Sequence, residues 1–122
     1  MTADRCEAFC EFAIAAARRL AGVPPGHPCA RLHGHTFLVR VTVRGPIDAQ
    51  TGFVADFADI QRAWAPVADA LDHRNLNNVP GLENPTSEHV AQWIWQALAS
   101  NLPALYAVEV RETGNSGVVY RG

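Results

Sequence analysis

The sequence lacks several features that would each point to a particular class of protein. Lysine and arginine together number 10 against 12 aspartates and glutamates, so the net charge is -2. A protein that gathers nucleic-acid phosphates usually carries an excess of basic residues, and we therefore expect no nucleic-acid partner. No apolar run approaches the ~20 residues needed to span a bilayer, because Ala13 to Ala17 is too short. We therefore expect no membrane contact.

A disulfide framework is also missing. The three cysteines, Cys6, Cys10 and Cys29, are odd in number and have no framework spacing. The N-terminus shows no basic segment followed by an apolar run and a small-residue cleavage site, so we expect a reduced, cytoplasmic protein. A length of 122 residues predicts one domain over residues 1–122, which is small for an enzyme that must form its pocket within one subunit. We therefore expect a site formed by residues of more than one subunit.

What the sequence does contain is a histidine pair at the start of a strand, in the segment Cys29 to Val43. His33 and His35 are two residues apart, so on a strand their side chains lie on the same face. The apolar residues that share this parity are Phe37, Val39, Val41 and Val43. The pair suits a metal site, although one solvated and one hydrogen-bonded histidine would explain it equally well. Cys29, four residues upstream of His33, adds a candidate metal ligand or nucleophile.

The residue patterns before and after this strand do not identify the type of secondary structure equally well. Residues 6–20 combine an alanine-rich segment typical of a helix with an alternation typical of a strand, and composition does not decide between them. Residues 23–28 hold three prolines and a glycine, which predicts a loop that delivers Cys29. Residues 35–44 form the clearest strand. The segments 106–113 and 118–120 predict a hairpin around residues 114–117.

Two helices are predicted between the strands. Asp56 is the expected N-cap of the first, and Pro66 should kink it into two unequal pieces. The second should start at Thr86 or Ser87, after a polar loop over residues 72–85. The expected buried stripes are Phe57, Ile60, Trp64, Val67 and Leu71 in the first helix, and Val90, Ala91, Ile94, Ala97 and Leu98 in the second. The order predicts an α+β domain in which two helices cover one face of an antiparallel sheet.

Five motifs in this order resemble one enzyme family. They are Cys29-x-x-x-His33-Gly34-His35, Gly52 to Phe57, Leu71-Asp72-His73-x-x-Leu76-Asn77, Glu83 to Glu88, and Val110 to Thr113. Together they cover nearly the whole chain and resemble the 6-pyruvoyltetrahydropterin and 6-carboxytetrahydropterin synthases, in particular the bacterial 6-carboxytetrahydropterin synthases of queuosine (7-deazaguanine) biosynthesis.

The resemblance implies a tunnelling fold (T-fold). In that fold residues 6–20 are a strand, and a four-stranded antiparallel sheet carries two helices on one face. Three subunits then close into an oligomeric barrel, and two such trimers stack into a hexamer with sites at the subunit interfaces. We therefore expect a homo-oligomer, trimer or hexamer, that binds a pterin-like small molecule.

The resemblance also implies a zinc site, and the sequence departs from it. His33 and His35 match two zinc ligands, but the third position holds Arg18, which has no lone pair and carries a positive charge. We expect an incomplete site with zinc absent or weakly bound, unless His27 or Cys29 completes it. Arg18 should instead lie in the pocket with its planar fork free to hold an oxygen of the ligand.

The remaining site residues match the family pattern. The resemblance gives Cys29, Asp72 and His73 as catalytic residues and Glu112 as the carboxylate that holds the pterin's amino-pyrimidine edge. Thr86 and Ser87 are candidate contacts to the ring. Without the resemblance, Asp72 and His73 would be an ordinary helix end, and helix capping would explain Thr86 and Ser87 as well.

Three functions follow from the resemblance. The first is a pterin-binding homologue with a defective zinc site and lost or altered lyase activity on 7,8-dihydroneopterin triphosphate. The second is a working 6-carboxytetrahydropterin synthase, a zinc-dependent carbon-carbon lyase, in which Arg18 or a surrogate ligand supplies the positive charge; other members of the family are carbon-oxygen lyases. The third is a non-catalytic pterin-binding module.

Overall fold

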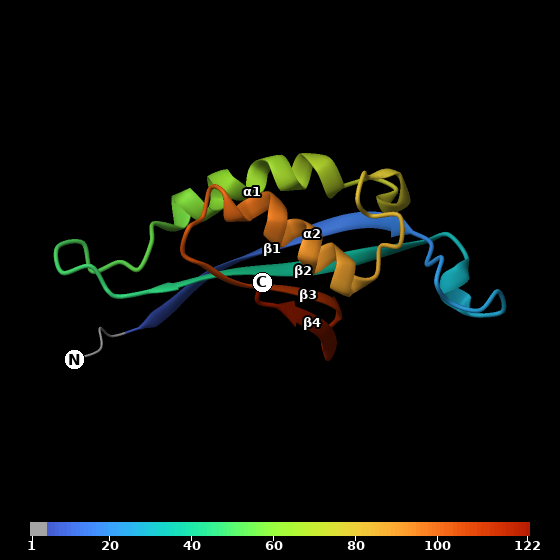
Figure 1. Ribbon diagram of the computed structural model, residues 1–122, viewed down its shortest axis with the longest axis horizontal. Helices are drawn as coiled ribbons and strands as arrows, with labels where there is room; N and C mark the ends of the chain where they lie inside the picture. The colour runs from blue at the N-terminus through green and yellow to red at the C-terminus, as the bar shows by residue number, and fades with distance from the viewer. Residues whose placement is uncertain (1–4) are drawn as a thin grey trace.

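The computed structural model describes residues 5–122, so the first four residues of the predicted 1–122 domain lie outside it. Four strands and two α-helices follow the predicted order, with two short 3-10 turns, η1 and η2 (Figure 1). Their bounds are β1 Cys6–Arg18, η1 Pro28–Ala30, β2 His33–Gly45, α1 Phe57–Leu71, η2 Leu76–Asn78, α2 Ser87–Ala99, β3 Leu105–Thr113 and β4 Ser116–Tyr120.

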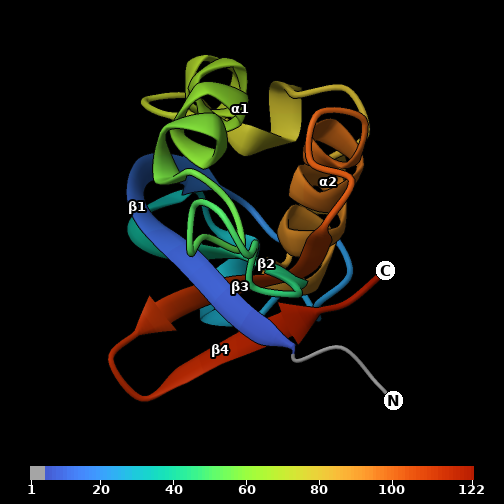
Figure 2. The ribbon, with the colours of Figure 1, turned by 90° about the vertical axis from the view of Figure 1, so that its left-hand side faces the viewer.

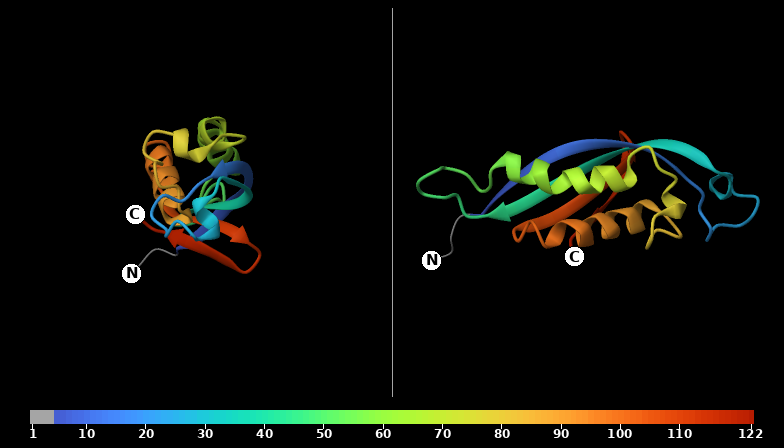
Figure 3. Two further views of the ribbon diagram at one scale, coloured as in Figure 1. Left: turned by 90° about the vertical axis from the view of Figure 1, so that its right-hand side faces the viewer. Right: turned by 90° about the horizontal axis from the view of Figure 1, so that it is seen from above.

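The four strands form one antiparallel sheet in the order β1-β2-β3-β4. Both helices pack on the same face of it (Figures 2 and 3). The core between these layers is built from the predicted odd-numbered row of β2, the facing residues of β1 and β3, and the apolar stripes of the helices. The predicted α+β class is confirmed. In the part of the chain described, neither helix is long and apolar enough to cross a membrane.

Strand β1 resolves the ambiguity of residues 6–20. It pairs with β2 without a register shift from Cys6 opposite Gly45 to Arg18 opposite His33. Its even-numbered residues face the helices, and Ile14, Ala16 and Arg18 are buried there. Ladder hydrogen bonds and burial against the helices therefore override the helix propensity of the alanines.

Three local predictions were wrong. Helix α1 is one element through Pro66 rather than two pieces. The proline is on the exposed side of the helix, where water can solvate the carbonyl group that it leaves without a donor. Phe57, the first residue of α1, is 56% exposed, and Ala97 is on the solvent side of α2. The other predicted stripe residues are buried.

The final hairpin is tighter than predicted, because Ser116 and Gly117 belong to β4 instead of the turn. Ser116 pairs with Thr113, and their hydroxyl oxygens are 2.7 Å apart. Gly117 pairs with Arg111, and a Cβ at this glycine would lie 2.6 Å from the Val110 carbonyl oxygen. Only a residue without a side chain fits this close approach.

Candidate functional site

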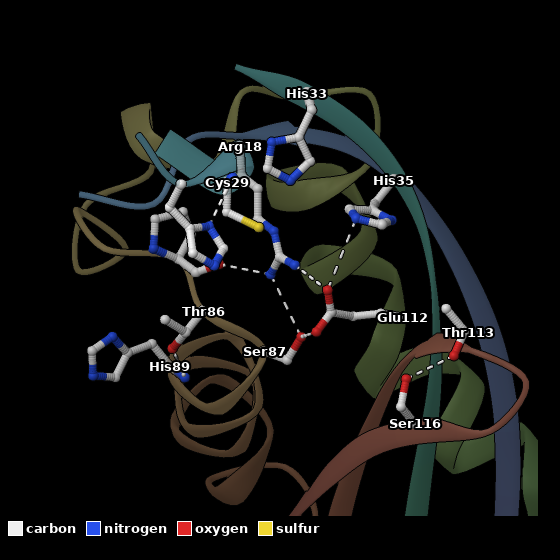
Figure 4. Close-up of polar contacts among 12 residues, drawn as sticks. Arg18, Cys29, His33, His35, Thr86, Ser87, His89, Glu112, Thr113 and Ser116 are labelled. Atoms are coloured by element: carbon white, nitrogen blue, oxygen red, sulfur yellow. Dashed lines mark hydrogen bonds and ion pairs between the residues drawn. The ribbon is translucent and has the colours of Figure 1, made fainter. Parts of the chain in front are cut away.

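Four of the predicted site residues come together at one end of the sheet. Arg18 ends β1, His33 and His35 begin β2, and Glu112 is near the end of β3. All four side chains are on the face that the helices cover, and Figure 4 shows Arg18, His35 and Glu112 joined by polar contacts, with His33 beside them. Ser87, the first residue of α2, closes the cluster from the helix layer.

The Arg18 guanidinium is buried and its fork is occupied. The residue is 2% exposed, Nη2 donates to Glu112 Oε1, and Nη1 donates to the Pro85 carbonyl oxygen at 3.0 Å. Nη1 also approaches Ser87 Oγ at 3.5 Å, and the guanidinium carbon is 4.9 Å from the centre of the Phe37 ring. The prediction that this fork is free for a ligand was therefore wrong: the protein itself uses both terminal nitrogens.

Glu112 is the acceptor at the centre of this network. Its Oε2 accepts a hydrogen bond from Ser87 Oγ at 2.9 Å, and its side chain is 35% exposed. Burial by itself raises the pKa of Glu112, but the Ser87 hydrogen bond and the Arg18 charge outweigh it, so the pKa is lowered. A carboxylate has about four lone-pair sites, so two remain for an incoming ligand.

Thr86 and Ser87 differ in what they contact. Thr86 is the N-cap of α2, and its Oγ1 accepts a hydrogen bond from the His89 N–H at 3.1 Å. Ser87 is buried and donates to Glu112 instead. The capping explanation therefore accounts for Thr86, whereas Ser87 belongs to the polar cluster.

The two histidines lie edge to face, with ring centres 5.2 Å apart. The Nδ1 atom of His33 is 2.7 Å from the Arg31 carbonyl oxygen, and His35 Nε2 is 3.9 Å from Glu112 Oε1. Burial lowers the pKa of His35, and the Arg18 charge lowers it further, so this ring is neutral near pH 7.

Within residues 5–122, the two histidines do not form a group of three with another side chain of His, Cys, Asp or Glu that could hold a metal ion. In the strand pairing, the residue opposite His33 is Arg18. The third position of the predicted zinc site is thus taken by a guanidinium that is engaged with Glu112.

Cys29 lies on η1, just beyond this end of the sheet. Its backbone carbonyl accepts from the Leu20 N–H at 2.8 Å, which ties the proline-rich segment to the end of β1. Its backbone N–H donates to His27 Nδ1 at 3.0 Å. The thiol is free and partly buried.

Asp72 and His73 form a pair on the outer edge of β1. His73 Nδ1 is 3.0 Å from Asp72 Oδ2, and His73 is 80% exposed. The Ala15 N–H donates to Asp72 Oδ1 at 2.9 Å, and this bond, followed by the one from His73, lowers the pKa of Asp72. The His73 N–H bonds back to the Ala15 carbonyl at 2.6 Å, with His73 at φ 58°. The pair thus covers part of the strand edge.

The structure separates the three predicted catalytic residues. Across residues 5–122, no hydrogen bond or ion pair joins Cys29 to Asp72 or His73. His73 instead borders a hollow of about 560 Å³ with Ala15 to Ala17 of β1 and Gly34 to Thr36 of β2. One chain therefore brings together Arg18, His33, His35, Ser87 and Glu112, and places the Asp72–His73 pair elsewhere.

Sequence reasoning did not find the Arg18–Glu112 pair. The available signal was parity: Arg18 continues the buried row of Ile14 and Ala16, and Glu112 continues that of Val108 and Val110. Two opposite charges at the ends of two buried rows in one sheet predict an ion pair, because an isolated buried charge is too unfavourable.

Comparison with known proteins identifies the family to which this fold and this polar cluster belong. A family model described as 6-pyruvoyl tetrahydropterin synthase matches residues 7–122, so the chain belongs to that family. Its named members act in pterin metabolism.

The chain is 42% identical over 118 residues to 6-carboxy-5,6,7,8-tetrahydropterin synthase of Synechocystis, covering 90% of this chain and 88% of the relative. It is 44% identical over 96 residues to human 6-pyruvoyl tetrahydrobiopterin synthase, covering 74% of this chain and 66% of the relative. The solved structure of Caenorhabditis elegans 6-pyruvoyl tetrahydropterin synthase superposes with a TM-score of 0.90 at 28% identity, covering 100% and 99% of the two chains. The T-fold of the single subunit is thereby confirmed.

Proposed function

We propose that this chain is a pterin-binding homologue of the 6-pyruvoyl- and 6-carboxytetrahydropterin synthases in which Arg18 has replaced the zinc site. One observation carries the proposal. The buried Arg18 guanidinium stands opposite His33 in the strand pairing, at the place where a third imidazole would complete a metal centre. A guanidinium has no lone pair for a metal and repels a cation, so these residues do not fit a tetrahedral zinc ion. Zinc is absent or weakly bound.

The ligand is proposed to bind through Glu112. Its carboxylate is ionised, partly exposed and fixed by Ser87 and Arg18, and it still has two lone-pair sites. The amino-pyrimidine edge of a pterin presents two parallel N–H donors, which match two carboxylate oxygens. Fixing the acceptor before the ligand arrives reduces the entropy lost on binding. Ser87 acts here as a positioning residue, and Thr86 as the helix cap beside it.

The standard lyase reaction on 7,8-dihydroneopterin triphosphate is proposed to be lost or altered, because its metal has no complete ligand set here. Cys29, Asp72 and His73 remain suited to proton transfer at a carbon activated by the pterin ring. A working 6-carboxytetrahydropterin synthase of queuosine biosynthesis is the second candidate. Retention of these three residues and the 42% identity to the Synechocystis synthase favour it. In that case the Arg18 charge would stabilise the developing oxyanion.

Assembly is part of the proposal, because Asp72 and His73 do not meet Cys29 within one chain. Closure of the sheet with a second copy, in the trimer or hexamer that the T-fold implies, would place the exposed His73 at a subunit interface, where a neighbour's thiol would complete the set. We therefore expect light scattering at micromolar concentration to give a trimeric or hexameric mass. A mass of 13.2 kDa, that of one chain, would contradict this part of the proposal. The cytoplasmic location expected from the cysteine count stays a prediction.

The binding experiment tests the proposed function directly. Protein treated with a chelator is titrated with 7,8-dihydroneopterin in a calorimeter, and 7,8-dihydroneopterin triphosphate turnover is followed separately with and without added zinc. We expect saturable pterin binding without metal and little turnover in either condition. Turnover that zinc restores would contradict the defective metal site. Full turnover without metal would favour the second candidate, and absence of pterin binding would reject both.

A further inference from the structure

At its C-terminal end, the outer edge of β1 is bonded to a loop instead of a strand. From Ala15 to Ala21, every second backbone N–H donates to the segment 72–84. The acceptors are Asp72 Oδ1 for Ala15, the Arg74 carbonyl oxygen for Ala17, Asn77 Oδ1 for Arg19 and Asn84 Oδ1 for Ala21, at 2.9, 3.0, 2.7 and 3.2 Å. Edge N–H groups need such partners, and the loop therefore takes the place of a neighbouring strand here.

Asn77 makes the most complete contact in this row. Its Oδ1 accepts from the Arg19 N–H at 2.7 Å, and its Nδ2 donates to the Arg19 carbonyl oxygen, also at 2.7 Å. Because a backbone N–H only donates and a carbonyl only accepts, these two bonds fix the orientation of the carboxamide. One side chain thus reproduces the pair of hydrogen bonds that an opposite residue makes in an antiparallel sheet.

Arg19 is the point at which β1 no longer has β2 as its partner. The pairing of the two strands ends with Arg18 opposite His33, and the Leu20 N–H bonds to the Cys29 carbonyl oxygen instead. Strand ends with few partners open most readily. The Asn77 bonds therefore hold the peptide group that directly follows Arg18, where the sheet itself no longer holds it.

Asn77 also holds the segment that carries an acceptor of Arg18. Its Nδ2 makes a second bond, to the Glu83 carbonyl oxygen at 3.3 Å, two residues before Pro85. The Pro85 carbonyl oxygen accepts from Arg18 Nη1 at 3.0 Å. The same carboxamide is thus bonded next to the donor, through Arg19, and close to the acceptor, through Glu83.

We infer that Asn77 is a positioning residue for the ligand site, because it fixes the place from which the Arg18 guanidinium holds Glu112. The inference rests on the proposed function, in which Glu112 binds the ligand. Asn77 acts through Arg18 and makes no contact with the ligand. Without the carboxamide the guanidinium can adopt several positions, and ligand binding has to immobilise it again.

Pterin affinity and an arginine signal test the inference together. Asn77→Ala should bind 7,8-dihydroneopterin roughly 2- to 12-fold more weakly than the parent, as expected when one further side chain has to be immobilised on binding. The ¹⁵N–¹H signal of the buried Arg18 Nε, assigned by its loss in Arg18→Met, should shift and exchange faster with water. Asn77→Asp keeps the acceptor for the Arg19 N–H but places an oxygen against the Arg19 carbonyl, so it should show both effects.

Asp48→Ala is the matched control. Asp48 Oδ1 also accepts from two backbone N–H groups, those of Gln50 and Thr51 at 2.8 and 2.9 Å, but it follows β2 at the end of the sheet away from Arg18 (Figure 1). Thermal unfolding should show a loss of stability, while the Arg18 signal and the pterin affinity stay as in the parent. If Asn77→Ala folds and keeps both the parent's affinity and its Arg18 signal, the inference is overturned and the proposed function stands.

A measurement on the parent keeps the inference testable if neither Asn77 variant folds. Opening at Asn77 would release Arg18 and Arg19 together, so the Arg19 N–H and the Arg18 Nε–H should be protected from hydrogen exchange to a similar degree. Protection of the Arg19 N–H more than about tenfold lower than that of Arg18 Nε–H would overturn the inference. Absence of pterin binding by the parent would overturn the proposed function, and with it the ligand-site role of Asn77.

Discussion

Arg18→His is expected to convert a protein that holds far less than one zinc per subunit into one that binds about one. The substitution places a third imidazole opposite His33, on strands whose pairing is already in register. It also removes the guanidinium charge that repels a cation. His35, one of the expected zinc ligands, has its Nε2 atom 3.9 Å from Glu112 Oε1. The bound zinc ion would therefore lie near this carboxylate and replace Arg18 as its positive partner. The test is the zinc content per subunit of parent and variant after dialysis against zinc, measured by elemental mass spectrometry.

Arg18→Met is the control for this experiment, because it removes the charge without adding a ligand. It should stay near the low zinc content of the parent, which separates ligand count from simple relief of repulsion. Circular dichroism of both variants must match the parent, because each leaves the Pro85 carbonyl without its donor. Stoichiometric zinc in the unmodified protein would show that His27, Cys29 or another group completes the site. If Arg18→His folds but gains no zinc, the three imidazoles do not form a zinc site, and the expectation is contradicted.

Glu112→Ala is expected to weaken pterin binding by about 2 to 4 kcal/mol, which is roughly 30- to 700-fold in Kd. The substitution removes the only carboxylate in the cluster and leaves the buried Arg18 charge without its partner. The free energy of unfolding should therefore also fall, by about 2 to 3 kcal/mol. This lies below the usual range for a buried pair, because Glu112 is one-third exposed. Calorimetry at a temperature where the variant is folded measures the first effect, and urea unfolding the second.

Two further variants sharpen the result. Glu112→Gln keeps the shape but presents one acceptor and one donor, so it should bind pterin almost as poorly as Glu112→Ala. Glu109→Ala removes a carboxylate of the same strand, on the opposite parity, where it pairs with Arg40 and Arg111. It should bind pterin like the parent. Unchanged affinity in Glu112→Ala would place the ligand away from this carboxylate.

Part of the site was predictable because it depends on local geometry. The two-residue spacing of His33 and His35 fixes them on one face of a strand, and the structure confirms the row that they start. The N-cap of α1 at Asp56 was predictable for the same reason, since a cap bonds to N–H groups two or three residues away. For α2 the pattern left Thr86 and Ser87 open, and the structure has Thr86 as the cap. The roles given to Cys29, Asp72 and His73 rest on the family resemblance and stay a prediction.

The sequence by itself determined the order of the elements and the parity of β2 and β3, because these properties follow from spacing along the chain. That Arg18 occupies the position of an expected third histidine followed from the family resemblance. The residue pattern left the alanine-rich segment Cys6–Arg18 open, and the family resemblance implied a strand there. The tertiary structure shows why it is a strand, because the segment pairs with β2 and is buried under the helices, and both lie outside any local window. Only the tertiary structure showed that Arg18 binds Glu112, 94 residues away. A buried charge must find its partner wherever the fold brings one, and sequence separation does not restrict that choice.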